Sequence, residues 1–490
     1  MKLAGIGRVL LVVAAVFVAV WLCVILYWRS SGATPGGTQM LLLLGVLPVG
    51  LLGGIWLLRR ARASRAGAAP AEEPKAVAAA SGDETTFEAT PPLHCLAAAL
   101  WLPCGDDAGQ VLAALPAPQR PGLHPKFRDR DGLPVFTAHV ERLETEGFAD
   151  TVAASAEAGR QLDQDEERVR ALALLEPVAT ELFDAAALLL PPLPVAEERV
   201  IAGLRRTEGH DIRVAVRVHA LLSMSWETPL RQAVADWLLE LALASGIDRR
   251  RIVLDVVPAD GAVTAWGLLD AIAGGTADGE AWHLVLACDS LVGERSVQRL
   301  IATGRLMDSR RSEGVVPGEG AAGVLLRPSV APEISGSGQD PAQAVALHRA
   351  SRAVLAAGMQ PRAAARSTGE LMSLALRRAD VEADAVALVL TDADQRPSRA
   401  VEASAGAAAA CPELDISTQC GALGVPCGET GHVAPIALLA LGTAQVRASM
   451  QAVLLLSLGA GLERMAAVIA PQAPEDRSPE QAGDAPAAAT

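Results

Sequence analysis

The sequence predicts an α/β protein whose large body is preceded by two transmembrane helices. Two long apolar stretches without a charged residue lie within the first 60 residues. From residue 92 to residue 470, short apolar runs alternate with amphipathic helical patterns. Such an alternation of strands and helices is typical of α/β proteins in which helices cover the faces of the sheets.

Charge is distributed unevenly along the chain. The protein has 490 residues and a net charge of −14. Residues 1–66 contain seven basic residues and no acidic one, so the rest of the chain carries a net charge of −21. An acidic body with one Tyr and six Phe offers neither a phosphate-binding surface nor aromatic stacking platforms. These features exclude nucleic-acid binding, and the hydrophobic content of 51% excludes an intrinsically disordered chain.

The two apolar stretches, residues 9–28 and 40–58, predict a transmembrane hairpin within residues 1–60. A helix rises about 1.5 Å per residue, so each stretch is long enough to cross a hydrocarbon core of roughly 30 Å. A cleaved signal peptide is the alternative for the first stretch, but the stretch is too long and residues 29–39 contain no convincing cleavage site. A buried core helix is the alternative for the second stretch, and its basic flank favours a membrane span.

Basic residues predict the orientation of this hairpin. Residues 59–65 (RRARASR) follow the second stretch, Lys2 and Arg8 precede the first, and the connecting loop contains only Arg29. Because basic residues stay on the cytoplasmic side, we expect both termini and the large body on the cytoplasmic face of a bacterial inner membrane. Seven irregularly spaced cysteines agree with a reducing compartment, since they form no disulfide framework.

Composition divides the remaining chain into three parts. Residues 61–91 are rich in Ala, Pro, Glu and Ser and are predicted to form a flexible linker. Residues 471–490 are polar and Pro-rich and are predicted to be a disordered tail. Residues 92–470 form the predicted domain. Its expected strands are residues 94–100, 213–219, 251–257, 283–287, 323–327, 385–390 and 465–469, and its expected helices are residues 231–245, 262–273, 369–379 and 432–447.

Two short patterns are similar to functional motifs but lack the context that those motifs need. Gly318-x-Gly320-x-x-Gly323 has the spacing of a dinucleotide fingerprint, but a strand pattern follows it where that fingerprint needs a helix. We therefore expect a tight turn there. Glu166 and Glu167 are interpreted as an exposed charge run and not as a carboxylate pair for acid–base catalysis.

The cysteines and histidines allow further interpretations. Cys411, Cys420, Cys427 and His432 have metal-ligand chemistry, but their spacing matches no structural zinc pattern. Cys427 with His432 is a candidate nucleophile and base, although such a cysteine is more often a small core residue. His283 and Cys288 flank an apolar strand and are also interpreted as core residues. We therefore predict no metal site and no cofactor.

A series of phrases in the order of one known family runs through residues 92–470. The phrases are LHCLAAALWLPCGDDAGQ, GAVTAWGLLDAIAGG, HLVLACDSL, EGVVPGEGAAGVLL, GELMSLALRRADVEADAVALVLTDAD, DISTQCGALGVPCGETGHVAPIALLALG and SLGAGLERMAAVIAP. Together they resemble the β-ketoacyl synthase branch of the thiolase-like fold, and EGVVPGEGAAGVLL is the most specific. The resemblance implies duplicated αβαβα layers. It also implies a homodimer in which the strand at residues 251–257 pairs with its symmetry mate.

The resemblance also implies where catalytic groups should lie. A ketosynthase uses a Cys thiolate at a helix N-terminus, two histidines and a lysine. The Cys position falls on Pro258, the first histidine on Thr391 or Asp392, the lysine on Gln419 and the second histidine on Val425. None of these residues can perform the family's role. The sequence therefore identifies no catalytic residue.

The sequence keeps the glycines and strands that resemble the family but lacks the family's catalytic residues. This combination predicts a pseudoenzyme, that is, a scaffold or adaptor with protein partners in an envelope complex. Degenerate ketosynthase-like proteins accompany some type VI secretion gene clusters, which suggests that setting. The alternative is an acyl-thioester or lipid-metabolising enzyme that uses non-standard residues, either Cys427 with His432 or Asp260. The membrane anchor favours the scaffold, because condensing enzymes of this family are normally soluble.

Overall fold

The computed structural model describes residues 91–152, 156–190, 198–201, 204–207, 215–275, 281–329, 345–459 and 461–472, together with Trp21. Within these ranges, no helix is both long enough and apolar enough to cross a bilayer. The predicted membrane hairpin, and nearly all of the predicted linker and tail, lie outside the described residues.

The first half of the body contributes five strands to the main sheet. Their spatial order is β7-β6-β8-β9-β1. β6 is parallel to β7 and β8, whereas β9 is antiparallel to β8 and β1. The strands are β1 (Leu93–Trp101), β6 (Val216–Ser223), β7 (Ile252–Ala259), β8 (Trp282–Ser290) and β9 (Glu319–Pro328).

The second half repeats this arrangement. Its spatial order is β13-β12-β14-β15-β11, again with two parallel pairs followed by two antiparallel pairs. β10 (Val345–Leu347) pairs with both β1 and β15 and joins the two halves into one sheet path. The strands are β11 (Ser351–Val354), β12 (Val386–Asp394), β13 (Cys420–Leu423), β14 (Ala452–Ser457) and β15 (Glu463–Pro471). The strands of the two halves thus have the same spatial order and the same relative directions. This agreement supports the duplication that the sequence resemblance implied.

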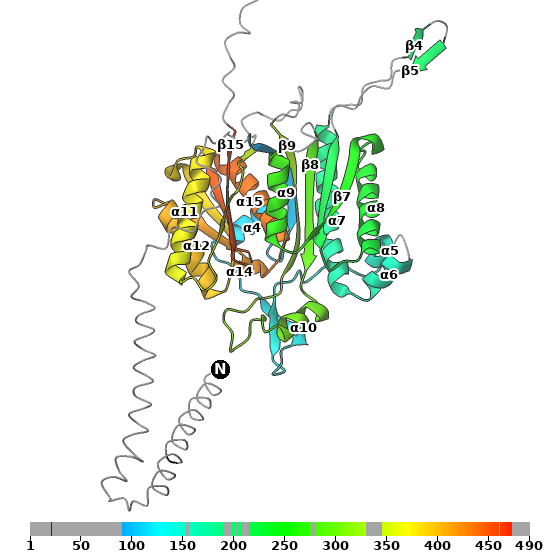
Figure 1. Cartoon of the computed structure of the whole chain (residues 1–490). Coiled ribbons are helices and arrows are strands. Elements are labelled where there is room, and N and C mark those ends of the chain that lie inside the picture. Colours follow the sequence, from blue (N-terminus) through cyan, green and yellow to red (C-terminus); the bar gives the residue numbers. More distant parts are fainter. Residues whose placement is uncertain are drawn as a thin grey trace, which may run out of the picture. The chain divides into compact units, whose positions relative to one another are not determined.

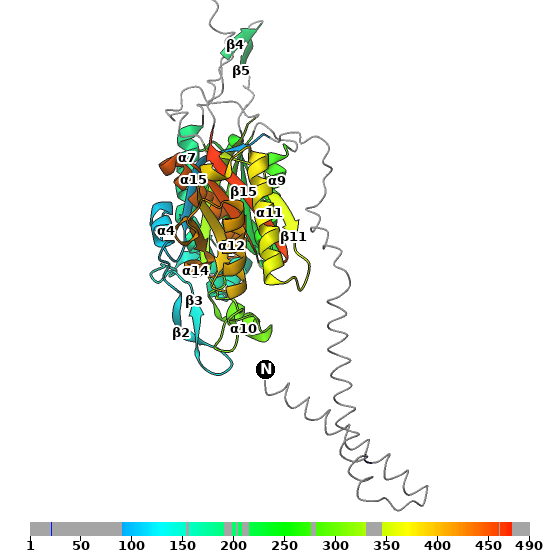
Figure 2. The same ribbon diagram turned by 90° about the vertical axis from the view of Figure 1, so that its left-hand side faces the viewer.

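Helices form three layers around these strands (Figures 1 and 2). α7 (Glu166–Leu189) and α8 (Thr228–Ala244) cover the outer face of the first half, and α11 (Pro361–Ala379) and α12 (Pro397–Ala410) cover that of the second. α9 (Ala262–Ala273) and α15 (Val433–Ser449) lie between the halves. The shorter helices are α4 (Ala108–Ala114), α5 (Phe148–Val152), α6 (Ala156–Asp163), α10 (Glu294–Ala302), α13 (Ile416–Gln419) and α14 (Gly424–Cys427), with 3-10 turns at Arg249–Arg251 and Ala383–Ala385.

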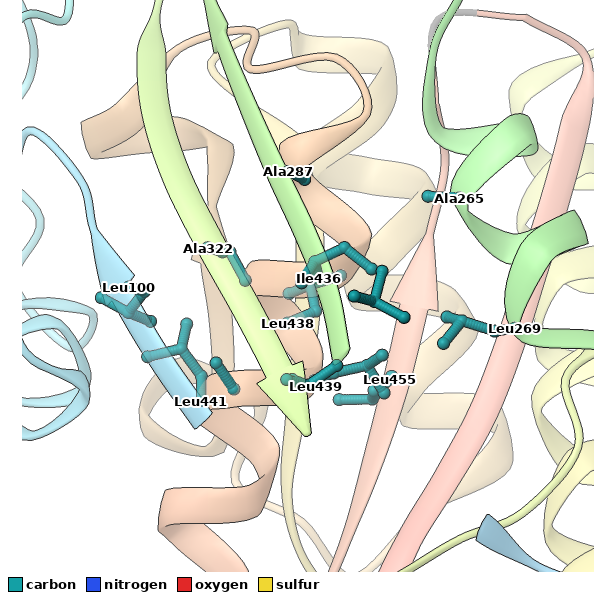
Figure 3. Close-up of a cluster of buried hydrophobic side chains, with 14 of the residues drawn as sticks. Leu100, Ala265, Leu269, Ala287, Ala322, Ile436, Leu438, Leu439, Leu441 and Leu455 are labelled. Atoms are coloured by element: carbon teal, nitrogen blue, oxygen red, sulfur yellow. The ribbon is translucent and has the colours of Figure 1, made fainter. Parts of the chain in front are cut away.

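The central layer is almost purely apolar. Figure 3 shows Leu269 of α9 and Ile436 of α15 among side chains from strands of both halves. α15 has buried residues all round its circumference, because sheet strands lie on both sides of it. A helix that is hydrophobic all round belongs in a core, and the burial of this layer stabilises the contact between the halves. Two small hairpins complete the described chain: β2 (Gly122–Arg128) with β3 (Pro134–Thr137), and β4 (Glu198–Ile201) with β5 (Leu204–Thr207).

Most expected elements are present, some with different ends. α9 begins and ends at the predicted residues, whereas α11 begins eight residues before the predicted Gly369. The longest described helix, α7, was not predicted, and Pro177 lies inside it. Glu167 is not part of an exposed run, since its carboxylate accepts bonds of 2.6 Å from the backbone N–H and the hydroxyl of Ser296. This correction shows that the first turn of α7 holds α10.

The glycine motif is not a tight turn. Gly320 and Gly323 lie inside β9 and are buried. A Cβ at Gly323 would lie 2.4 Å from Leu182 Cδ1 and 2.8 Å from Leu286 Cδ2. A Cβ at Gly320 would lie 2.5 Å from Leu102 Cδ2. Close packing of α7 and β8 therefore requires Gly323, close packing of Leu102 requires Gly320, and neither glycine marks a phosphate site or a turn.

Candidate functional site

A cavity of about 430 Å³ lies where the N-termini of α9 and α15 approach each other. Asp260 and Gly261 line it from the start of α9, and His432 lines it from the start of α15. The carboxyl ends of the parallel strands also reach this cavity, with Asp289 at the end of β8 and Asp394 at the end of β12. Helix N-termini and the carboxyl ends of parallel strands are common places for ligand sites in α/β proteins.

Asp392 is the most extensively bonded acid of the cavity wall. It accepts bonds from the backbone N–H of Leu458 at 2.6 Å, from the backbone N–H of Gly459 at 3.3 Å and from the hydroxyl of Ser457 at 2.6 Å. Burial raises the pKa of Asp392, and these three bonds oppose that shift. Two adjacent backbone donors, which could otherwise bind an anion in the cavity, are therefore occupied by a side chain of the protein.

His432 has a defined orientation in the cavity. Its Nε2 lies 3.0 Å from the backbone carbonyl of Cys288, and its Nδ1 lies 3.7 Å from Oδ2 of Asp289. A carbonyl can only accept, so Nε2 carries a proton and Nδ1 faces the carboxyl group. Burial raises the pKa of Asp289, and His432 opposes that shift.

A third charged group completes the wall. Arg396 contacts Asp394 through Nε at 2.8 Å and approaches Oε2 of Glu429 at 3.5 Å. Burial raises the pKa of Glu429, and Arg396 opposes the shift. With Asp260 and Asp289, this cluster makes the cavity rich in carboxylates, which is unlike an apolar channel for an acyl chain.

The structure separates the residues that the resemblance singled out. Asp392 lines the cavity, but Pro258, Gln419 and Val425 are not among its lining residues. Pro258 lies on β7 and is exposed, because that strand continues to Ala259 before α9 begins. The side chain of Gln419 instead donates to the backbone carbonyl of Ala387 at 3.1 Å.

Two other residues lie at the cavity ends of the central helices. Asp260 lies at the cavity end of α9, where its Oδ1 accepts a 2.9 Å bond from the hydroxyl of Thr264. His432 reaches the cavity from the start of α15.

The Cys427–His432 pair is not assembled as a nucleophile and base. Cys427 Sγ lies 3.3 Å from Cys104 Sγ, whereas the ring of His432 is directed to Cys288 and Asp289. Cys427 is buried, and burial raises the pKa of its thiol well above the usual value. Such a thiol is not activated as a catalytic nucleophile towards a substrate in the cavity.

The other candidate cysteines and histidines lie in separate places. Cys411 follows α12, Cys420 begins β13, and Cys288 is fully buried in β8. Across the described ranges, no three His, Cys, Asp or Glu side chains form a group that could hold a metal. His283 is a core residue with a partner, because its Nδ1 lies 3.0 Å from Nε2 of His219 on the neighbouring strand.

Sequence reasoning missed Asp289, Asp394, Arg396 and Glu429 as cavity residues. A signal was present for the first two, because each follows an apolar run that predicts a buried strand. Polar residues directly after parallel strands gather at one sheet edge. Arg396 and Glu429 carried no comparable signal, since loops bring them to the cavity.

Comparison with known proteins identifies the fold. No protein-family model and no curated protein sequence matches the chain. A Streptomyces albus oxazolomycin ketosynthase domain is similar in structure, with a TM-score of 0.52 and 14% identity, covering 79% of this chain and 76% of that one. The ketosynthase from module 6 of the Bacillus subtilis bacillaene synthase gives a TM-score of 0.52 and 12% identity, covering 78% and 72%. A type II polyketide ketosynthase solved with its acyl-carrier protein gives 0.50 and 11%, covering 78% of this chain and all of that one.

The body is therefore a mixed α/β domain with a ketosynthase-like, thiolase-like fold. At these identities the similarity defines the architecture alone, so the function must be argued from the cavity.

Proposed function

We propose that this protein is a catalytically inactive ketosynthase-like scaffold or adaptor. The observation that carries the proposal is the occupation of the Leu458 and Gly459 backbone donors by Asp392. A condensing enzyme needs free donors where negative charge develops on the substrate oxygen. Here a carboxylate already occupies them and adds negative charge to the same place.

The start of α9 supports the same proposal. It presents Asp260 and Gly261 to the cavity, and none of the described lining residues is a cysteine. A carboxylate cannot form the thioester on which condensation of acyl chains depends. Ser223 and Ser225 also line the cavity, but their hydroxyls bond to each other at 2.9 Å and not to a basic group. Neither serine is thus activated by a basic group in the way that acyl transfer needs.

The setting that we propose follows from the sequence. Residues 9–28 and 40–58 would anchor the protein in a bacterial inner membrane, with the body on the cytoplasmic face. In that position the body would bind protein partners of an envelope complex, and the resemblance to proteins that accompany type VI secretion genes favours a secretion machine. The surface of the ketosynthase-like body would then bind these partners and help to assemble the complex.

A second candidate function rests on His432. Nδ1, the ring nitrogen that does not donate to the Cys288 carbonyl, lies 3.7 Å from the Asp289 carboxyl group, whose charge would favour a proton taken up there. An acyl-thioester or lipid-metabolising enzyme that uses non-standard residues is therefore the alternative.

One experiment separates the two candidates. The full chain, purified in detergent, is incubated with acyl- and malonyl-carrier thioesters beside an active ketosynthase, and acyl-enzyme mass and released carbon dioxide are measured. We expect no adduct and no release above background. A stoichiometric acyl adduct, or turnover that disappears in His432→Ala, would contradict the scaffold and establish the enzyme.

A further inference from the structure

We propose that Cys104 and Cys427 are a redox modification site, at which a peroxide converts the two thiols into a reversible disulfide. The two Sγ atoms lie 3.3 Å apart although the residues are 323 positions apart in the chain. Both cysteines are free thiols in the structure. A disulfide has an S–S length of about 2.05 Å, so the sulfur atoms need to approach by only about 1.2 Å.

The backbone holds both cysteines in place. Cys104 lies in the turn between β1 and α4, which two backbone hydrogen bonds between Leu102 and Gly105 close. Cys427 ends α14, and Glu429 just after it donates its backbone N–H to Val316 at 2.9 Å. The backbone thus holds both segments in position while the two sulfur atoms lie 3.3 Å apart.

The two cysteines differ in a way that defines their roles. Cys104 is half-buried and Cys427 is fully buried. The hydrogen bond from Cys427 lowers the pKa of Cys104, while burial raises the pKa of Cys427. Cys104 is therefore the thiol that meets the oxidant, and Cys427 is the resolving thiol.

The chemistry is balanced with a peroxide as oxidant. The Cys104 thiol loses its proton, the thiolate attacks one oxygen of hydrogen peroxide, and the O–O bond breaks to give a sulfenic acid and hydroxide. The hydroxide takes up the proton that the thiol released and becomes water. The Cys427 sulfur then attacks the Cys104 sulfur, loses its proton, and displaces a second water. Two thiols and one peroxide thus give one disulfide and two waters, and a dithiol reductant reverses the change.

Oxidation would act on the cavity as well as on the cysteines. Residues 428–432 follow Cys427 directly and line the cavity wall. The disulfide would tie this wall to the turn after β1, which joins the second half of the body to the first. Among the described cysteines, burial raises the pKa of Cys411 and of Cys420 to about 11, so these two thiols react less readily with a peroxide.

The test uses the full chain in detergent. Hydrogen peroxide is titrated in, and peptides are mapped by mass spectrometry without reduction. We expect a Cys104–Cys427 crosslink, the loss of two of the seven thiols, and recovery of both with dithiothreitol. The oxidised chain should also melt several degrees higher, because the crosslink restricts the unfolded state.

Variants assign the roles. Cys427→Ala should stop at a sulfenic acid on Cys104 that dimedone traps, and Cys104→Ser should leave Cys427 unlabelled. Cys420→Ser is the matched control and should keep the crosslink. Absence of the crosslink in the wild-type chain while other cysteines oxidise would overturn the proposal, as would dimedone labelling of Cys427 in Cys104→Ser.

Discussion

The carboxylate of Asp392 accepts a 2.6 Å hydrogen bond from the backbone N–H of Leu458. Asp392 lies near the carboxyl end of β12, and Leu458 directly follows the neighbouring parallel strand β14, so the bond joins the two strands at the cavity edge of the second half. It stabilises a loop turn in which Gly459 adopts a φ of +52°. The same contact removes a donor that a bound anion could use.

Replacing Asp392 should destabilise the body. Asp392→Ala leaves the buried N–H group of Leu458 without its acceptor, which costs about 1–3 kcal/mol. It also removes the acceptor of the half-buried N–H group of Gly459. Asp392→Asn keeps one acceptor oxygen and should cost less. Urea unfolding checks the order wild type, Asn, Ala. The exposed Asp384→Asn is the control and should unfold like wild type. Equal stability of Asp392→Ala and wild type would show that the bonds contribute nothing.

The buried pair His219–His283 should make stability depend on pH. Burial lowers the pKa of His219 to about 4, whereas the unfolded value is 6.5. The unfolded chain therefore binds the proton first, so stability is complete above about pH 6.5 and falls as the pH decreases towards 4. The loss amounts to about 3 kcal/mol by pH 4. His219→Gln lacks this titrating group. We therefore expect the unfolding free energy of wild type, relative to that of His219→Gln, to fall as the pH decreases from 6.5 to 4. A difference independent of pH would contradict the assignment.

Gly323 tests the packing of α7 on β9. Gly323→Ala puts a Cβ 2.4 Å from Leu182 Cδ1 and should destabilise by about 1–3 kcal/mol through overpacking. Gly267→Ala in α9 meets nothing within 4 Å and should stabilise by up to about 1 kcal/mol through helix propensity. Thermal unfolding checks this: the melting temperature should fall in Gly323→Ala and rise in Gly267→Ala. A neutral Gly323→Ala would mean that α7 can shift freely.

The membrane topology remains a prediction. A reporter that is active only in the periplasm should be silent when fused at Thr490 and active when inserted at Gly36, because the basic residues retain both ends in the cytoplasm. Activity at Thr490 would contradict both the hairpin and the cytoplasmic placement.

A homodimer through β7 is the last prediction. β7 is an edge of the sheet path, where it pairs with β6 alone among the described strands, and Val253 on it is 44% exposed. An open, largely apolar edge favours pairing with a second copy. A body lacking residues 1–70 should sediment as a dimer at micromolar concentration, and Val253→Asp should shift it to a monomer. A monomeric wild-type body would show that this edge is not an interface.

The sequence predicted the architecture well because strands and helices leave a periodic apolar pattern. The runs that became β1, β8 and β15 and the helix α9 were recognisable from a few residues each. α7 escaped prediction because its apolar residues surround much of the helix, and Pro177 interrupts the pattern. Gly323 of β9 was misinterpreted because its neighbours in space, Leu182 and Leu286, are distant in sequence.

The α/β class of the body was predictable from the sequence, because the periodicities of strands and helices are properties of neighbouring residues. Only the tertiary structure decided which residues face the cavity. Asp392 and Leu458 are 66 positions apart, and Cys104 and Cys427 are 323 apart. Such contacts depend on the crossing of distant strands and loops, where a shift of one residue changes the side chain that points inward, and local patterns contain no record of it.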